Sequence, residues 1–221
     1  MAFNSALGQR IGGSWGTIAT LASVDGTATH PMPRALSGAT VAVRDLTDAV
    51  HAMCWLHGRH PGVIDHAVVH SHQPAAQDWL ESAAAAFTEE RTYLARLTAA
   101  AGPLPSTPGQ AESEGAVAGQ RHALDMLAQS DRTGCATGAA IALVLDWAAI
   151  RVMLDAAARR FGVEPPASDL PDEMETASLV SALAETPAIE RAMAFGAQQI
   201  LAQHRGLWDL LEARASARNR Q

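Results

Sequence analysis

The sequence predicts an all-α protein, and three observations support that prediction. Alanine supplies 47 of the 221 residues, whereas only ten residues are aromatic. Alanine has the highest helix propensity, while strands favour β-branched and aromatic side chains. Apolar residues recur at helical spacing from about residue 39 onward, and charged residues make up only 18% of the chain. The chain is therefore expected to fold into one helical domain with a buried core.

The first part of the chain is predicted to be irregular. Residues 1–38 are rich in glycine, serine and threonine, show no sustained period, and are closed by Pro31 and Pro33. Such a composition is typical of loops. We therefore divide the chain into an irregular N-terminal arm over 1–38 and a single helical-bundle domain over 39–215.

Two long helices are expected in the first half of that domain. Apolar residues at helical spacing predict a helix over 40–57, and Gly58 follows as a stop signal. A short helical turn over 61–70 precedes a second long helix over 75–101. The loop at 102–109 contains three prolines and two glycines, so no helix can cross it.

Three further helices complete the predicted bundle. A third long segment spans 112–129, and a fourth spans 135–161 before Gly162. Thr186 and Pro187 form a start signal for the last helix, over 187–215. A short helix over about 169–185 precedes it. The expected architecture is an up-down bundle of four long helices with additional short ones.

The helix over 135–161 is predicted to lie at the centre of the bundle. Between residues 134 and 150 its only charged residue is Asp146, and apolar side chains surround the helix. The apolar run is shorter than the roughly 20 residues that a membrane span needs, and it contains an aspartate. We therefore expect a buried core helix and no transmembrane segment.

Composition also excludes several classes of function. The formal charge is −7, and all 16 basic residues are arginines. Without a basic run we expect no nucleic-acid partner, and without lysine the chain has no Schiff base or P-loop. The N-terminal region lacks a convincing signal-peptide core, so a cytoplasmic location is expected. The two cysteines, Cys54 and Cys135, are expected to be small buried hydrophobes rather than a disulfide framework.

Asp146 is the most informative candidate residue. A lone buried carboxylate is costly, and its helical neighbours offer no partner, so the partner must come from another helix. The candidates for that partner are Arg121, His122, His51 and His204. Two interpretations are open: a structural pair that fixes the helix register, and a catalytic or metal-binding group.

Other polar residues have spacings that suit a site. His66 and His70 are four residues apart, the spacing at which two imidazoles can share a metal ion. Asp48 and His51 are three residues apart and could orient one another. Helical wheels place Glu90 and His204 near the buried stripes of their helices, with Arg91 on the buried side as an ion-pair partner for an acid of another helix. The structural alternative for this whole group is a set of buried ion pairs and a solvated histidine cluster.

The layout of residues 39–215 resembles the ferritin-like helical bundles. The resemblance rests on long helices, a proline-rich crossover loop between the second and third of them, and inward-leaning carboxylates and histidines. Di-iron members carry Glu on two helices and Glu-x-x-His on the other two. This chain contains no Glu-x-x-His, and its nearest match is Asp48-Ala-Val-His51.

Two functional hypotheses follow. The first is a non-enzymatic structural or interaction module of bacterial type, in which the polar interior is structural and no cofactor is bound. The second is a degenerate ferritin-like protein that binds Fe, Mn or Zn or performs an oxidation, and the metal content of the purified protein separates the two.

A homodimer is also expected, because Trp79 and Trp208 lie off the buried stripes of their helices and tryptophan often anchors interfaces. The alternative for these two residues is that the N-terminal arm covers them.

Overall fold

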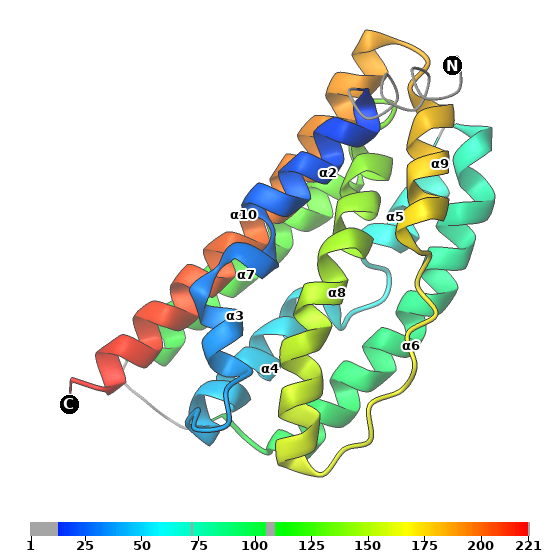
Figure 1. Ribbon diagram of the computed structural model, residues 1–221. Coiled ribbons are helices and arrows are strands. Elements are labelled where there is room, and N and C mark those ends of the chain that lie inside the picture. Colours follow the sequence, from blue (N-terminus) through cyan, green and yellow to red (C-terminus); the bar gives the residue numbers. More distant parts are fainter. Residues whose placement is uncertain (1–12, 72, 105–108, 221) are drawn as a thin grey trace, which may run out of the picture.

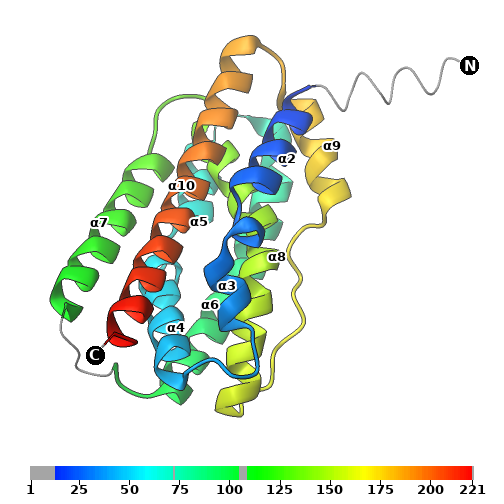
Figure 2. The ribbon, with the colours of Figure 1, turned by 60° about the vertical axis from the view of Figure 1, so that its left-hand side comes forward.

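The fold is built from helices packed side by side. The structure, a computed structural model, describes residues 13–71, 73–104 and 109–220. Within these ranges every regular element is a helix and no strand is present, which confirms the all-α prediction. The long helices lie side by side with their axes roughly aligned, and α8 lies near the centre of the bundle (Figures 1 and 2).

The helices predicted from periodicity are all present, and their ends differ from the predicted ones by a few residues. The fourth long segment agrees at both ends, and Gly162 stops it with a left-handed φ of 70°. The last begins at Pro187 as predicted, with the Thr186 side chain accepting from the Ile189 N–H. The observed elements are α4 (Val43–His57), α5 (Val63–His70), η2 (Pro74–Ala76), α6 (Gln77–Ala101), α7 (Gln110–Ala128), α8 (Cys135–Phe161), α9 (Glu173–Leu183) and α10 (Pro187–Arg218).

The prediction of an irregular arm over 1–38 was wrong for most of its length. The segment contains α2 (Ser14–Asp25), the 3-10 helix η1 (Thr27–Thr29) and α3 (Pro31–Leu36), while residues 1–12 lie outside the described part of the chain. The two α-helices follow one another along the outside of α8 and α10 (Figure 2). Packing of the Ile18 side chain, which is buried, outweighs the weak helix propensity of the glycines and threonines.

The relative direction of the last two long helices, α8 and α10, differs from the predicted up-down layout. Gly134 lies beside Ile189, and Asp146 lies beside His204, so α8 and α10 run in the same direction. Residues 162–186, which include α9, therefore run back along the bundle on the side of α8 that faces away from α10 (Figures 1 and 2). The crossover was predicted in the loop at 102–109, but α6 ends and α7 begins at the same end of the bundle, and both helices pack against α4 (Figure 2). A proline-rich loop marks a break and carries no information about direction.

Helices α8 and α10 are in unusually close contact at two glycines. A Cβ atom on Gly138 would overlap the carbonyl oxygen of Met193, and one on Gly196 would overlap that of Cys135. Both obstacles are backbone atoms, so they cannot turn aside as a side chain would. The absence of two side chains therefore sets the distance between these helices.

Helix α8 is also the one described helix that is long and apolar enough to cross a membrane by length and composition. In its most apolar stretch, 78% of the residues are buried inside the protein. That burial is typical of the central helix of a folded core.

Two tryptophans predicted to anchor a dimer interface lie inside the chain. Trp208 is fully buried and Trp79 is 9% exposed, so neither is available to a second copy. The Trp208 Nε1–H donates to the Thr27 hydroxyl at 2.9 Å. The N-terminal segment thus covers Trp208, as the alternative interpretation expected, and the homodimer itself stays a prediction.

Candidate functional site

Asp146 is buried at the centre of the bundle and is paired with His204. The carboxyl group is 4% exposed, and its Oδ2 accepts a hydrogen bond from His204 Nδ1 at 2.6 Å. His204 was one of the four predicted partners. The other three lie elsewhere: His122 is exposed, Arg121 borders a cavity, and His51 bonds to the Gly102 carbonyl.

Thr27 completes the hydrogen bonding of the carboxylate. Its backbone N–H donates to Asp146 Oδ1 at 2.7 Å, and its hydroxyl donates to Oδ2 at 2.6 Å. Three donors therefore stabilise one buried negative charge, which is how a buried carboxylate becomes tolerable. Sequence reasoning missed Thr27, because a single threonine in a stretch without periodicity carries no signal of a long-range contact.

His57 extends this network by one more ring. Its Nε2 lies 2.9 Å from His204 Nε2, and its imidazole packs edge-on against the rings of Phe87 and Trp147. Sequence reasoning placed His57 only in a histidine cluster. The sequence did indicate that His57 is buried, because position 57 lies one helical step beyond the apolar residues of the buried face of α4.

The surroundings lower the pKa values of both His57 and Asp146. Burial acts in that direction at His57 and against it at Asp146. Burial, followed by the positive charges of His204 and Arg91, lowers the pKa of His57 well below its usual value. Burial alone would raise the pKa of Asp146, but the hydrogen bond and charge of His204 and the two hydrogen bonds from Thr27 lower it. The chain thus holds an ionised carboxylate at one end and a neutral imidazole at the other near neutral pH.

The geometry allows a coupled movement of protons along the two rings. Because the Asp146 carboxylate only accepts, His204 Nδ1 carries a proton, and one more proton lies between the two Nε2 atoms. When His204 holds that proton, His57 is protonated at Nδ1; when His57 holds it, Nδ1 has a free lone pair. A proton lost or gained at His57 Nδ1 is therefore matched by transfer between the rings. In the state with the extra proton the positive charge lies on His204 beside Asp146, and once that proton has left both rings are neutral.

His57 borders a cavity of about 170 Å³. No described residue forms a hydrogen bond with His57 Nδ1, the ring nitrogen that faces away from the pairing with His204. Its neighbours around the cavity come from the end of α4, the following loop, α5, α6 and α7. They are Leu56, Arg59, His60, Pro61, Gly62, Val63, His66, Phe87, Arg121, Leu124, Asp125 and Gln129.

An ion pair fixes the loop that forms one wall of this cavity. Both carboxylate oxygens of Asp65 lie 2.8 Å from Arg91 Nη2, and the Gly62 N–H donates to Asp65 Oδ2 at 2.7 Å. This is the ion pair that the sequence predicted for Arg91 with an acid of another helix. It holds the loop at 58–62 against α6 and so shapes the cavity in advance of any ligand.

We expect the stability of the protein to fall as the pH drops below about 6.5, the usual pKa of histidine. The unfolded chain accepts a proton on His57 near that pH, whereas the folded protein resists protonation because the pKa of His57 is lowered. The stabilising contribution is therefore present above the unfolded pKa and is lost below it, by up to about 1.4 kcal/mol per pH unit. Urea unfolding between pH 5 and 7.5 measures this slope.

The control for this experiment is a pair of histidine variants. His57→Gln should flatten the slope in that pH range, while His122→Gln, at an exposed position on α7, should leave it unchanged. Parallel curves for wild type and His57→Gln would show that His57 is not the group responsible.

The predicted metal ligands do not form a closed site among the described residues. His66 and His70 lie on one face of α5 with ring centroids 6.1 Å apart, and His66 borders the cavity. A group suited to a cation by distance is His30 with Asp209 and Glu212. However, His30 Nδ1 accepts from the Met32 N–H, so its Nε2 carries the proton and donates to Asp209. That tautomer cannot ligate a metal ion through Nε2.

Asp48 and His51 do not orient one another as predicted. Asp48 pairs with two arginines of the last helix, Arg214 at 3.1 Å and Arg218, while His51 bonds to the Gly102 carbonyl at 2.8 Å. Their side chains therefore serve two separate contacts at the end of the bundle.

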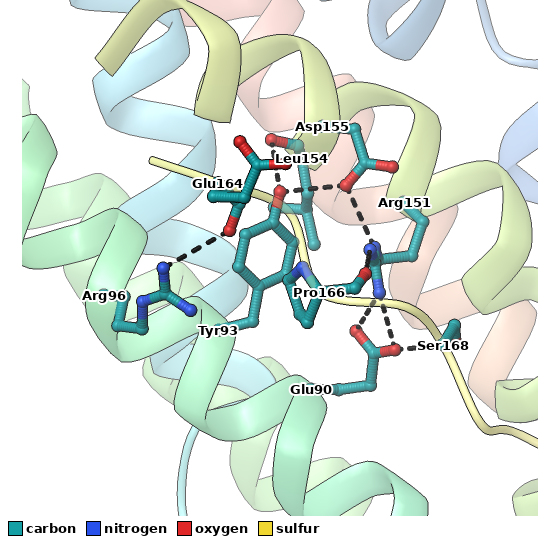
Figure 3. A network of polar contacts seen from close by, with 9 residues as sticks. All are labelled: Glu90, Tyr93, Arg96, Arg151, Leu154, Asp155, Glu164, Pro166 and Ser168. Atoms are coloured by element: carbon teal, nitrogen blue, oxygen red, sulfur yellow. Dashed lines mark hydrogen bonds and ion pairs between the residues drawn. The ribbon is translucent and has the colours of Figure 1, made fainter. Parts of the chain in front are cut away.

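Glu90 is buried, as predicted, and belongs to a second network (Figure 3). Its carboxylate receives Arg151 Nη1 at 2.8 and 2.9 Å and the Ser168 hydroxyl at 2.8 Å. Arg151 Nη2 also donates to the Pro166 carbonyl at 2.7 Å. The network thus attaches the returning segment after α8 to the helices α6 and α8.

Tyr93 and Asp155 complete this second network. The Tyr93 hydroxyl donates to Asp155 at 2.8 Å, and burial followed by this hydrogen bond raises the pKa of Tyr93. A cavity of about 500 Å³ lies nearby, bordered by Arg151, Asp155 and Ser168. All three side chains already have partners within the network, so we interpret it as structural.

The comparisons with known proteins identify one family. No curated protein and no solved structure matches the chain significantly. One family profile, described as a family of unknown function, matches residues 22–219, which include Thr27, His57, Asp146 and His204. The chain therefore belongs to the family DUF6975.

Proposed function

We propose that this protein is an enzyme that transfers protons to and from a small substrate bound beside His57. The observation that supports the proposal is the chain from Asp146 through His204 to His57, which ends at a cavity. A buried carboxylate with an imidazole at 2.6 Å is a common way to position a histidine for acid–base chemistry. Here a second imidazole carries that arrangement from the core to the cavity.

In this proposal each residue has a separate role. His57 is the catalytic residue, because its Nδ1 is the atom beside the bound substrate. His204 and Asp146 are positioning residues: His204 supplies or receives the proton at Nε2, and the Asp146 carboxylate stabilises the positive charge that His204 carries while it holds that proton. As general acid, His57 gives its Nδ1 proton to the substrate and takes the proton of His204 on Nε2; as general base, it reverses both transfers.

The buried location of the charge favours this mechanism over a lone histidine. Were His57 to become an imidazolium in its apolar surroundings, it would carry an uncompensated charge between Phe87 and Trp147. Transfer to His204 places the charge 2.6 Å from a carboxylate instead. The energetic cost of desolvating the protonated state is thereby reduced.

Conversion of small metabolites in D₂O tests the proposal. Wild-type protein is incubated with a mixture of small neutral, cationic and anionic metabolites, and conversion or deuterium incorporation is followed by proton NMR. We expect a compound that is converted by wild type and by His122→Gln at the same rate. His57→Gln should convert it at least about 100-fold more slowly, the usual contribution of a general acid or base.

His204→Gln supplies a readout that a purely structural role would not change. It should shift the pH dependence of the rate. When His57 exchanges a proton with the substrate, position 204 could no longer give or take the second proton at Nε2. The proposal fails if no compound is converted above the rate in buffer, or if His57→Gln converts it as fast as wild type. The first outcome would favour the non-enzymatic module, which, like the ferritin-like metal protein, stays a prediction from the sequence.

A further inference from the structure

The charged residues around the cavity beside His57 are mainly positive, whereas the chain as a whole is negative. The full chain has a formal charge of −7. The cavity, in contrast, is bordered by Arg59 and Arg121, with Asp125 as the one carboxylate among its lining residues. A concave surface concentrates the field of the charges that line it, so the two arginines favour an anionic ligand there.

The two arginines also differ from the arginines that hold the fold together. Arg91, Arg151 and Arg218 each lie within ion-pair distance of a carboxylate. Arg59 and Arg121 form no hydrogen bond or ion pair within the described part of the chain, although they come from different elements and border the same cavity. Their guanidinium groups are therefore free to bind a ligand.

The site is small and its wall is fixed before a ligand arrives. A cavity of about 170 Å³ is below the roughly 300–1,000 Å³ of sites for drug-sized ligands, so it suits a small molecule. The contact of Asp65 with Arg91 and with Gly62 keeps the loop that carries Arg59 in place. Less ordering is then required when a ligand binds.

We propose that the cavity binds a small dianion, a dicarboxylate or a phosphate, with Arg59 and Arg121 as its anchors. Planar guanidinium groups recognise both kinds of oxyanion through paired hydrogen bonds. The assignment names the substrate class of the proposed enzyme and rests on that function only for the role of His57. Binding of the anion itself does not require proton transfer.

Calorimetric titration at pH 7.5 and low salt tests this assignment. The probes are malonate, inorganic phosphate and malonamide, which has the size of malonate without its charge. We expect malonate or phosphate to bind, with the stronger of them identifying the oxyanion, and malonamide not to bind. Arg121→Gln and Arg59→Gln should each weaken binding at least tenfold, and circular dichroism checks that both variants are folded.

Two further variants test whether binding depends on the two cavity arginines rather than on any arginine or on His57. Arg34→Gln removes an exposed arginine of α3 away from the cavity and should leave the affinity unchanged. His57→Gln keeps both arginine anchors and should bind the anion more tightly than either arginine variant does; binding by wild type without any turnover that depends on His57 would overturn the proposed enzyme and leave the anion site standing. Absence of binding by both anions, equal binding of malonamide, or affinity that survives both cavity substitutions overturns the anion site.

Discussion

Replacing Asp146 by alanine is expected to lower the free energy of unfolding by about 3–5 kcal/mol at pH 7. The substitution removes the acceptor of three hydrogen bonds, so the buried His204 Nδ1–H and the N–H and hydroxyl of Thr27 lose the group to which they donate. His204 is 1% exposed, so water cannot replace the lost carboxylate. Urea unfolding followed by circular dichroism measures the change.

Three related substitutions sharpen this prediction. Asp146→Leu fills the space but should be nearly as costly as alanine, because its buried partners cannot reach water. Asp146→Asn keeps one acceptor and should cost about half as much, while Asp131→Ala, at an exposed position, should stay within about 0.5 kcal/mol of wild type. A stable Asp146→Leu would show that the network contributes nothing to the fold.

Replacing Gly196 by alanine is expected to destabilise the protein by about 3 kcal/mol, at the upper end of the range for overpacked cores. The added methyl group would overlap the Cys135 carbonyl and crowd the backbone N–H of Ala139. Because these are main-chain atoms of α8, the two helices must separate, and the contacts on either side are weakened. In a domain of this size the melting temperature should fall by about 6–12 °C.

The matched control for this change has the opposite sign. Gly115 and Gly119 lie on the exposed side of α7, and nothing lies near a Cβ atom at either position. Alanine at these positions should stabilise the helix by about 0.5–1 kcal/mol each. If Gly196→Ala behaves like Gly115→Ala, helix propensity rather than close packing determines the outcome.

The sequence predicted helices well where their apolar pattern was strong and their ends were marked. The ends of α8 were correct because an apolar run is bounded by glycines at 134 and 162. Helix α2 was missed because its stability comes from packing against α10, which local composition does not reveal. The parallel direction of α8 and α10 was missed for a related reason, since helical periodicity carries no information on direction.

The candidate site was predicted in part. Burial of Asp146 followed from the apolar surroundings in its own helix, and His204 followed from its place on a buried stripe. Which of four candidates would pair with it could not be decided, because the choice depends on how four helices rotate and shift against one another. The role of His57 depends on a cavity formed by five elements, and no local pattern indicates such a cavity.

The network around Asp146 has a consequence for the synthesis of the chain. Thr27 leaves the ribosome long before Asp146, and His204 leaves it 58 residues later. Until α10 emerges, the aspartate at the centre of α8 lacks its imidazole partner, and the apolar faces of α8 have no parallel neighbour to cover them. Contacts between such distant residues form slowly, because large loops must close first. The nascent chain is therefore expected to expose the apolar surface of α8 from the emergence of this helix until α10 follows it, and a chaperone that shields apolar segments would act on this helix first.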